Sequence, residues 1–234
     1  MNTPTAPRAR LSIALLALCL LALGVAGCKQ SKGASSSARG ADEPEMTEGG
    51  ELVFEETFDD REPGTHWKRG QGEDGRGRWR VEDGWMVGND IKNDALWLEQ
   101  ELPDDVRIEW DVQAMSPIGD IKVEVFGDGK THESGYVFIF GGWKNTLDVI
   151  ARLDEHGKDR KERQTHGVVP NTTYEMAIER TGDTLHWFVN GEHFMSYQDD
   201  NMLEGEGHRH FAFNIWSAPV RFDNVEVYDL SGVE

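Results

Sequence analysis

Short runs of alternating apolar and polar residues fill the chain beyond residue 50, and no other feature constrains the fold as strongly. One run alternates an apolar with a polar set, Val106, Ile108, Trp110 and Val112 against Arg107, Glu109, Asp111 and Gln113. A second run alternates Ile121, Val123 and Val125 with Lys122 and Glu124. Because successive side chains of a strand point to opposite faces, such strands are predicted to have one dry face and one wet face.

Turn-forming residues separate these runs. Gly, Asp and Asn recur between them, and residues 190–191 form the Asn-Gly pair that favours a two-residue hairpin turn. No stretch of this part of the chain keeps apolar residues at i, i+3, i+4 and i+7 for three turns. The pattern predicts an antiparallel sandwich or barrel. Trp110 and Trp187 lie in the apolar register of their strands, so we expect both in the core.

Four segments carry a resemblance to a known group of folds. They are FEETFDD at 54–60, WRVEDGWMVG at 79–88, VNGE at 189–192 and FDNVEVYDL at 222–230. Together they resemble the concanavalin A-like jelly rolls, notably the laminin-G-like and 3-keto-disaccharide hydrolase-like domains of exported bacterial proteins. The resemblance implies an all-β, antiparallel two-sheet jelly-roll sandwich over residues 51–230, followed by a short C-terminal tail at 231–234. A shared fold does not fix an activity.

The first 28 residues are typical of an exported, lipid-anchored protein. Arg8 and Arg10 precede an apolar run over residues 11–27, as in a secretory signal peptide. The ending Val-Ala-Gly-Cys at 25–28 resembles the lipobox of bacterial lipoproteins, with Val25 where Leu is commoner. That resemblance implies removal of residues 1–27 and diacylation of Cys28. The alternative is an uncleaved membrane helix, but the run is at the short end of the spanning length and contains Gly24 and Gly27.

Residues 28–50 are expected to combine the lipidated cysteine with a flexible tether. Residues 29–50 are rich in Ser, Gly, Ala and charge and cannot form a core. Lys29 follows the cysteine in place of the aspartate associated with inner-membrane retention, so the resemblance favours the outer membrane of the cell envelope. The other cysteine, Cys19, lies in the signal segment, which leaves the folded domain without a disulfide. The net charge of −19 argues against nucleic acid and anionic lipid surfaces as partners.

Known catalytic motifs are incomplete or missing. Laminarinase-type relatives of this fold carry Glu-x-Asp-x-x-Glu on one strand, and Glu109 and Asp111 begin this pattern, but Ala114 stands at its last position. The sequence has no Gly-x-Ser-x-Gly and no His-Glu-x-x-His. His208 and His210 share a strand face as a candidate metal pair without a third ligand at motif spacing. These observations leave open whether the chain is an enzyme and argue more against an enzymatic function than for it.

Carbohydrate binding is the leading functional hypothesis from the sequence. Pyranose rings stack on aromatic side chains, and their hydroxyls bind polar ones. The candidates that share strand faces or follow strand ends are Trp143, Arg152, Asp154, His210, Asn214 and Trp216. A glycan-active enzyme of the 3-keto-disaccharide hydrolase type and a non-catalytic protein-interaction module are the alternatives. No cofactor is expected apart from a structural calcium ion, for which Glu56, Asp59 or Asp223 could supply oxygen ligands. The oligomeric state is not indicated.

Overall fold

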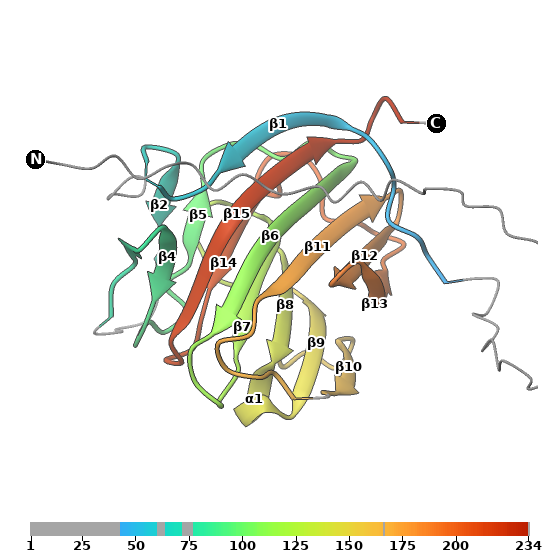
Figure 1. Ribbon diagram of the computed structural model, residues 1–234. Coiled ribbons are helices and arrows are strands. Elements are labelled where there is room, and N and C mark those ends of the chain that lie inside the picture. Colours follow the sequence, from blue (N-terminus) through green and yellow to red (C-terminus); the bar gives the residue numbers. More distant parts are fainter. Residues whose placement is uncertain (1–42, 60–63, 72–76, 166, 234) are drawn as a thin grey trace, which may run out of the picture. The chain divides into compact units, whose positions relative to one another are not determined.

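Two antiparallel β-sheets form the folded part of the protein (Figure 1). The computed structural model describes residues 43–59, 64–71, 77–165 and 167–233. The all-β sandwich expected from the alternating pattern is confirmed. Cys28, the signal segment and the first part of the expected tether lie outside the described residues. Within the described part, no helix has the length and apolar character needed to cross a membrane.

The first sheet has eight strands and is centred on two long ones. Seven of them follow one another in the order β13 (Glu192–Gln198), β12 (Thr184–Val189), β11 (Tyr174–Thr181), β6 (Val106–Ala114), β15 (Val220–Asp229), β4 (Trp85–Gly88) and β3 (Arg80–Glu82). The eighth, β1 (Glu51–Glu56), pairs with β15. The Asn-Gly pair joins β12 to β13, as expected of a hairpin turn.

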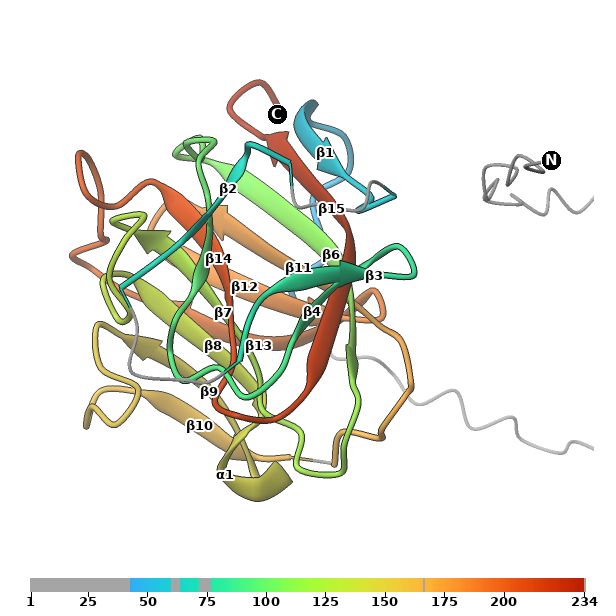
Figure 2. The same cartoon turned by 90° about the vertical axis from the view of Figure 1, so that its left-hand side faces the viewer.

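The second sheet has seven strands and carries most of the residues discussed below. Its order is β10 (Lys161–Gln164), β9 (Leu147–Arg152), β8 (Tyr136–Gly141), β7 (Ile121–Gly127), β14 (His210–Asn214), β5 (Leu96–Leu98) and β2 (Trp67–Arg69). Figure 2 shows β7, β8 and β9 running side by side, with the short element α1 (Gly142–Asn145) at their end.

The core lies between the two sheets. Ile121, Val123 and Val125 from the second sheet and Ile108 from the first belong to one buried cluster. Aromatic rings link the layers, since Phe213 of β14 stacks on Phe222 of β15 at a centroid distance of 4.1 Å. Trp110 and Trp187 are both 2% exposed, so their assignment to the core is confirmed.

Two strands depart from the expectation of one dry and one wet face. Lys122 and Glu124 point away from the core, as predicted, but they are buried, with exposures of 1% and 0%. Along β9, Asp148, Ile150 and Arg152 alternate with the apolar Leu147, Val149 and Ala151, and this alternation predicts that the apolar set faces the core. The structure has the reverse, because Ile150 belongs to the core cluster, whereas Val149 and Ala151 form a second apolar cluster with Val137 and Ile139. The polar residues beside Ile150 are satisfied by partners: Asp148 Oδ1 accepts from the Gly141 N–H, and Arg152 Nε donates to Asp199 Oδ2.

The residues just before β1 attach to the first sheet. The Thr47 N–H donates to Glu179 Oε2 at 2.9 Å, and the Arg107 guanidinium donates to the Thr47 carbonyl. The last part of the segment expected to be a tether is therefore held to the domain at Thr47.

Candidate functional site

A cavity of about 490 Å³ lies on the face of the seven-stranded sheet that points away from the core. Lys122 of β7 and Ile139 of β8 reach it from the sheet. Its volume is within the range of about 300–1,000 Å³ that is usual for small-molecule sites. The remaining lining residues come from the loops and turns around these strands: Asn93, Ile118, Asp120, His132, Glu133, Trp143, Lys144, Glu155, His156 and Trp216.

Lys122 brings a buried positive charge to the cavity. Its Nζ lies 2.6 Å from Glu155 Oε2 and donates to Asn93 Oδ1 at 3.0 Å. A buried ammonium without partners would be strongly destabilising, so these two acceptors explain how a lysine can occupy this position. Glu155 belongs to the turn that follows β9, which means that the loop and the sheet are joined through this ion pair.

Glu124 is the second buried charge on β7 and makes three hydrogen bonds. Its Oε1 lies 2.8 Å from His132 Nδ1 and accepts from Asn214 Nδ2 at 2.6 Å, and its Oε2 accepts from the Glu133 N–H at 2.9 Å. Two of these partners belong to the loop between β7 and β8. Glu124 therefore fixes that loop over the sheet and orients the His132 ring.

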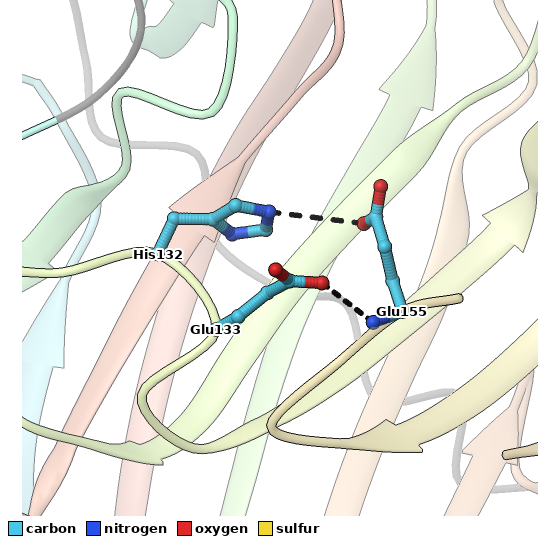
Figure 3. A group of neighbouring side chains, drawn as sticks. All are labelled: His132, Glu133 and Glu155. Carbon is cyan, nitrogen blue, oxygen red and sulfur yellow. Dashed lines mark hydrogen bonds and ion pairs between the residues drawn. The ribbon is translucent and has the colours of Figure 1, made fainter. Parts of the chain in front are cut away.

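His132, Glu133 and Glu155 meet where two loops approach each other (Figure 3). His132 Nε2 lies 3.9 Å from Glu155 Oε2, and the Glu155 N–H donates to Glu133 Oε1 at 2.5 Å. In the part of the chain that the structure describes, this is the one group of three or more His, Cys, Asp or Glu residues whose ligand atoms lie within 4.8 Å of one another. An imidazole and two carboxylates are ligands suited to a divalent transition metal, and they also suit the hydroxyls of a polar ligand.

Asp120 links this charged region to Trp216. Burial raises the pKa of Asp120, while the Lys122 charge and the hydrogen bond from the Trp216 N–H work against that rise. The Trp216 N–H donates to Asp120 Oδ2 at 2.9 Å. The Trp216 side chain is 43% exposed, with Lys92 Nζ 5.6 Å from its ring centroid.

Trp143 is held at the other rim by an unusual turn. Trp143, Lys144 and Asn145 have φ values of 49°, 62° and 62°, a left-handed conformation that a bulky residue such as tryptophan rarely adopts. Gly141 begins the turn at φ 69°, where a Cβ would collide with Val168. The Asn145 side chain binds both backbone polar groups of Val168, at 2.8 and 2.9 Å. Strain maintained by several contacts is typical of functional positions.

The structure brings together only some of the predicted sugar-binding residues. Trp143 and Trp216 line the cavity. Asn214 is fully buried behind it, where it supports Glu124. Arg152 and Asp154 are not among the lining residues. Arg152 Nε donates to Asp199 Oδ2 at 2.7 Å, and Asp154 Oδ1 accepts from the His156 N–H at 2.8 Å within a turn.

His210 is also outside the cavity lining. Its Nδ1 lies 3.0 Å from the Leu98 carbonyl, and the Nδ1 of His208 lies 3.2 Å from the Phe126 carbonyl. Both members of the suggested metal pair thus face backbone acceptors.

The other candidate acids make local contacts. Glu109 Oε1 accepts from Arg107 Nε at 2.7 Å, and Asp111 Oδ2 accepts from Asn224 Nδ2 at 2.6 Å, both on the eight-stranded sheet. The carboxylates considered for calcium each accept a hydrogen bond from a residue next to them or two positions away: Glu56 from the Phe58 N–H, Asp59 from the Thr57 hydroxyl and Asp223 from the Asn224 N–H.

The sequence did not single out Lys122, Glu124, His132 or Glu155 as site residues. Lys122 and Glu124 were visible as the polar half of an alternating strand, a pattern that solvated strands share. What distinguishes them is burial beneath the loops that carry His132 and Glu155. This depends on contacts between residues far apart in the sequence, such as the Lys122 to Asn93 and Lys122 to Glu155 pairs, which are 29 and 33 positions apart.

The chain matches one family model over most of its length. The model describes the 3-keto-alpha-glucoside-1,2-lyase-like domain and matches residues 53–228. No curated protein sequence matches the chain.

Solved structures share the fold at low sequence identity. A protein from work on endo-acting O-glycanases that human gut bacteria express to begin mucin breakdown has a TM-score of 0.56 and 15% identity, covering 77% of this chain and 100% of its own. The β-glucanase of Bacillus licheniformis has a TM-score of 0.52 and 13% identity over 77% and 98% of the two chains. The carbohydrate-binding module CBM66 of Bacillus subtilis has a TM-score of 0.51 and 18% identity, and the match covers 70% of this chain and 96% of the module. These likenesses show the concanavalin A-like fold.

Proposed function

This chain belongs to the family of 3-keto-alpha-glucoside-1,2-lyase-like domains, and from that premise we propose that its cavity binds a glycoside. The observation that carries the proposal is the pairing of the exposed Trp216 and the half-buried Trp143 with charged and amide side chains around one cavity of about 490 Å³. A sugar ring offers C–H groups to an aromatic face and hydroxyls to polar side chains. Trp143 and Trp216 are the stacking residues in this proposal, and Asn93, Lys122 and Glu155 are the hydroxyl partners.

The fold supports the same proposal at a coarser level. Structures with this fold include one that is called a carbohydrate-binding module and one that is called a glucanase. Because a fold can host many activities, the argument rests on the cavity, and the neighbours only agree with it.

Binding is tested with a glycan array probed with the purified full-length protein in detergent, followed by calorimetric titration of each hit. We expect at least one glucoside-containing glycan to bind and to saturate at one site per chain. An array without any hit would reject the proposal and favour the protein-interaction module.

Cleavage of a glycoside is the second candidate function, favoured by the buried charges on β7. A carbonyl group at C3 of a glucoside makes the C2–H acidic, so that removal of this proton and loss of the C1 substituent cleave the glycosidic bond. Such a reaction needs a proton acceptor and a positive group near the ketone oxygen. His132 and Lys122 both line the cavity and offer these two chemistries. Incubation with methyl α-glucoside and with its 3-keto derivative tests it, since only the ketone should release methanol.

For the cellular location, we propose a lipid anchor at Cys28 in the bacterial envelope, with the outer membrane as the favoured site. The support is the lipobox-like ending at 25–28 and Lys29 after it. In the source bacterium, a Cys28→Ala variant should lose incorporation of labelled fatty acid and accumulate unprocessed. Normal labelling of that variant would refute the anchor.

A further inference from the structure

A chain of hydrogen bonds from the backbone of β14 to the cavity determines the state of the His132 ring. The Ile215 N–H donates to Asn214 Oδ1 at 2.8 Å, which identifies that atom of the amide as the oxygen. The other end, Nδ2, must then donate, and it does so to Glu124 Oε1 at 2.6 Å. Asn214 and Glu124 are both 0% exposed, so solvent does not compete with these bonds.

The same carboxylate oxygen fixes the proton on His132. Glu124 Oε1 lies 2.8 Å from His132 Nδ1, and a carboxylate can only accept. The contact of Asn214 Nδ2 with His132 Nδ1, at 3.2 Å, is longer than the contacts that both nitrogens make with Glu124 Oε1, at 2.6 and 2.8 Å. The hydrogen between His132 and Glu124 therefore belongs to Nδ1, and in the neutral ring Nε2 carries the lone pair.

His132 Nε2 points toward Glu155, another residue that lines the cavity, without a hydrogen bond to it. The distance from Nε2 to Glu155 Oε2 is 3.9 Å, which is too long for a hydrogen bond (Figure 3). Lys122 Nζ lies 2.6 Å from the same Glu155 oxygen, so a positive group stands close to the imidazole. An ammonium has three N–H donors; among the described residues, Lys122 donates a hydrogen bond to Asn93 and forms an ion pair with Glu155.

We infer that His132 Nε2 is the general base of a glycoside elimination in this cavity, with Glu124 as the positioning residue that fixes its tautomer. The inference rests on the second candidate function above. In the step, Nε2 takes the proton from C2 of a 3-keto-glucoside, and the Lys122 ammonium donates to the ketone oxygen as negative charge develops there. The C2–H electron pair becomes the C1–C2 double bond, and the C1–O bond breaks. The leaving oxygen takes the proton back from His132, so no oxidant or other reactant is consumed.

Kinetics of full-length protein variants on methyl 3-keto-α-glucoside test the base. His132→Gln should lower kcat by about 10² to 10⁴-fold and leave the Kd for unoxidised methyl α-glucoside within a factor of two. Glu124→Gln should lower kcat by about 10 to 100-fold with little change in KM. His66→Gln, outside the cavity, is the matched control.

A measurement on the resting protein needs no substrate. Nitrogen NMR at alkaline pH should find His132 protonated on Nδ1 and bare on Nε2, and Glu124→Leu should produce a mixture of tautomers. A resting His132 protonated on Nε2 would overturn the inference, as would full kcat in His132→Gln. Loss of turnover in EDTA would also overturn it, because Nε2 would then be a metal ligand. If methyl α-glucoside binds but its 3-keto derivative is not cleaved, the elimination and its base are rejected and the binding proposal stands. If neither sugar binds, the binding proposal, the elimination and the base are all rejected.

Discussion

The two outward faces of the sandwich look alike in sequence and differ in structure. On the eight-stranded sheet, the polar half of β6 is only partly covered. Glu109 pairs with Arg107, and the two side chains are 32% and 7% exposed. On the seven-stranded sheet, the polar half of β7 is closed over, and Lys122 and Glu155 pair with side-chain exposures of 2% and 13%. Loops make this difference, since His132, Glu133 and Glu155 come from segments that fold over β7.

The comparison shows what separates a solvated strand face from a site. Alternation determines which side chains leave the core, but it does not determine what covers them. Charges that are covered and paired hold loops in place and keep their interactions out of water, where they are stronger. The partly covered charges of β6 serve as a built-in reference for experiments on β7.

The largest difference between the two faces should appear in stability. Lys122→Met leaves Glu155 buried without its cation, and we expect a loss of about 3–5 kcal/mol in the free energy of unfolding. Glu109→Gln removes the corresponding charge from the other face and should cost about 0–1 kcal/mol. Urea unfolding of the full-length variants measures both values. Equal losses would mean that the two faces are not distinguished by burial.

Tryptophan substitutions should separate the faces in ligand binding. Trp216→Ala is expected to weaken the binding of a glycan hit by about 1–3 kcal/mol, or about 5- to 150-fold in Kd, with little change in Tm. Trp85 is the matched control, because it lies on β4 of the other sheet with Arg221 stacked 4.6 Å from its ring centroid. Trp85→Ala should leave the Kd unchanged. A Trp216 variant that unfolds would show instead that this ring is needed for packing.

The smallest expected effect concerns Asp199, which pairs with Arg152 at 2.7 Å. Burial alone would raise the pKa of Asp199, but hydrogen bonds from Tyr136, the Asn201 N–H and Arg152 outweigh it and lower the pKa below 3.8. A carboxylate whose pKa is lowered in the folded state stabilises the fold at pH values above the pKa of the unfolded chain. This stability is lost as the pH falls through the pKa of the folded state. Asp199→Asn should therefore cost about 1–2 kcal/mol at pH 7, and progressively less below pH 4. Denaturation at several pH values tests this, and a constant cost would contradict it.

The strands were predictable from sequence, whereas the covered site was predictable only in part. The pattern of β6 specified its core face correctly, because its apolar and polar residues alternate without exception from Val106 to Gln113. On β9 the alternation predicted the wrong face, because the polar Asp148 and Arg152 lie on the same side as Ile150, which packs in the core, so Arg152 and Asp154 were wrongly assigned. Trp143 and Trp216 could be recognised as rings at strand ends. His132 and Glu155 could not, because their positions depend on pairs with β7 that local patterns do not encode.

The central claim, that the cavity on the seven-stranded sheet binds the sugar, is tested most directly by nitrogen–proton NMR of the tryptophan indoles during a glycan titration. The chain has eight tryptophans and therefore eight indole N–H signals. Five of them, Trp67, Trp79, Trp97, Trp110 and Trp187, are buried. We expect the signals of Trp143 and Trp216 to shift with the same Kd, and those of Trp85 and the buried five to stay in place. A saturable shift of Trp85 without shifts of Trp143 and Trp216 would place the sugar on the other sheet and contradict the account.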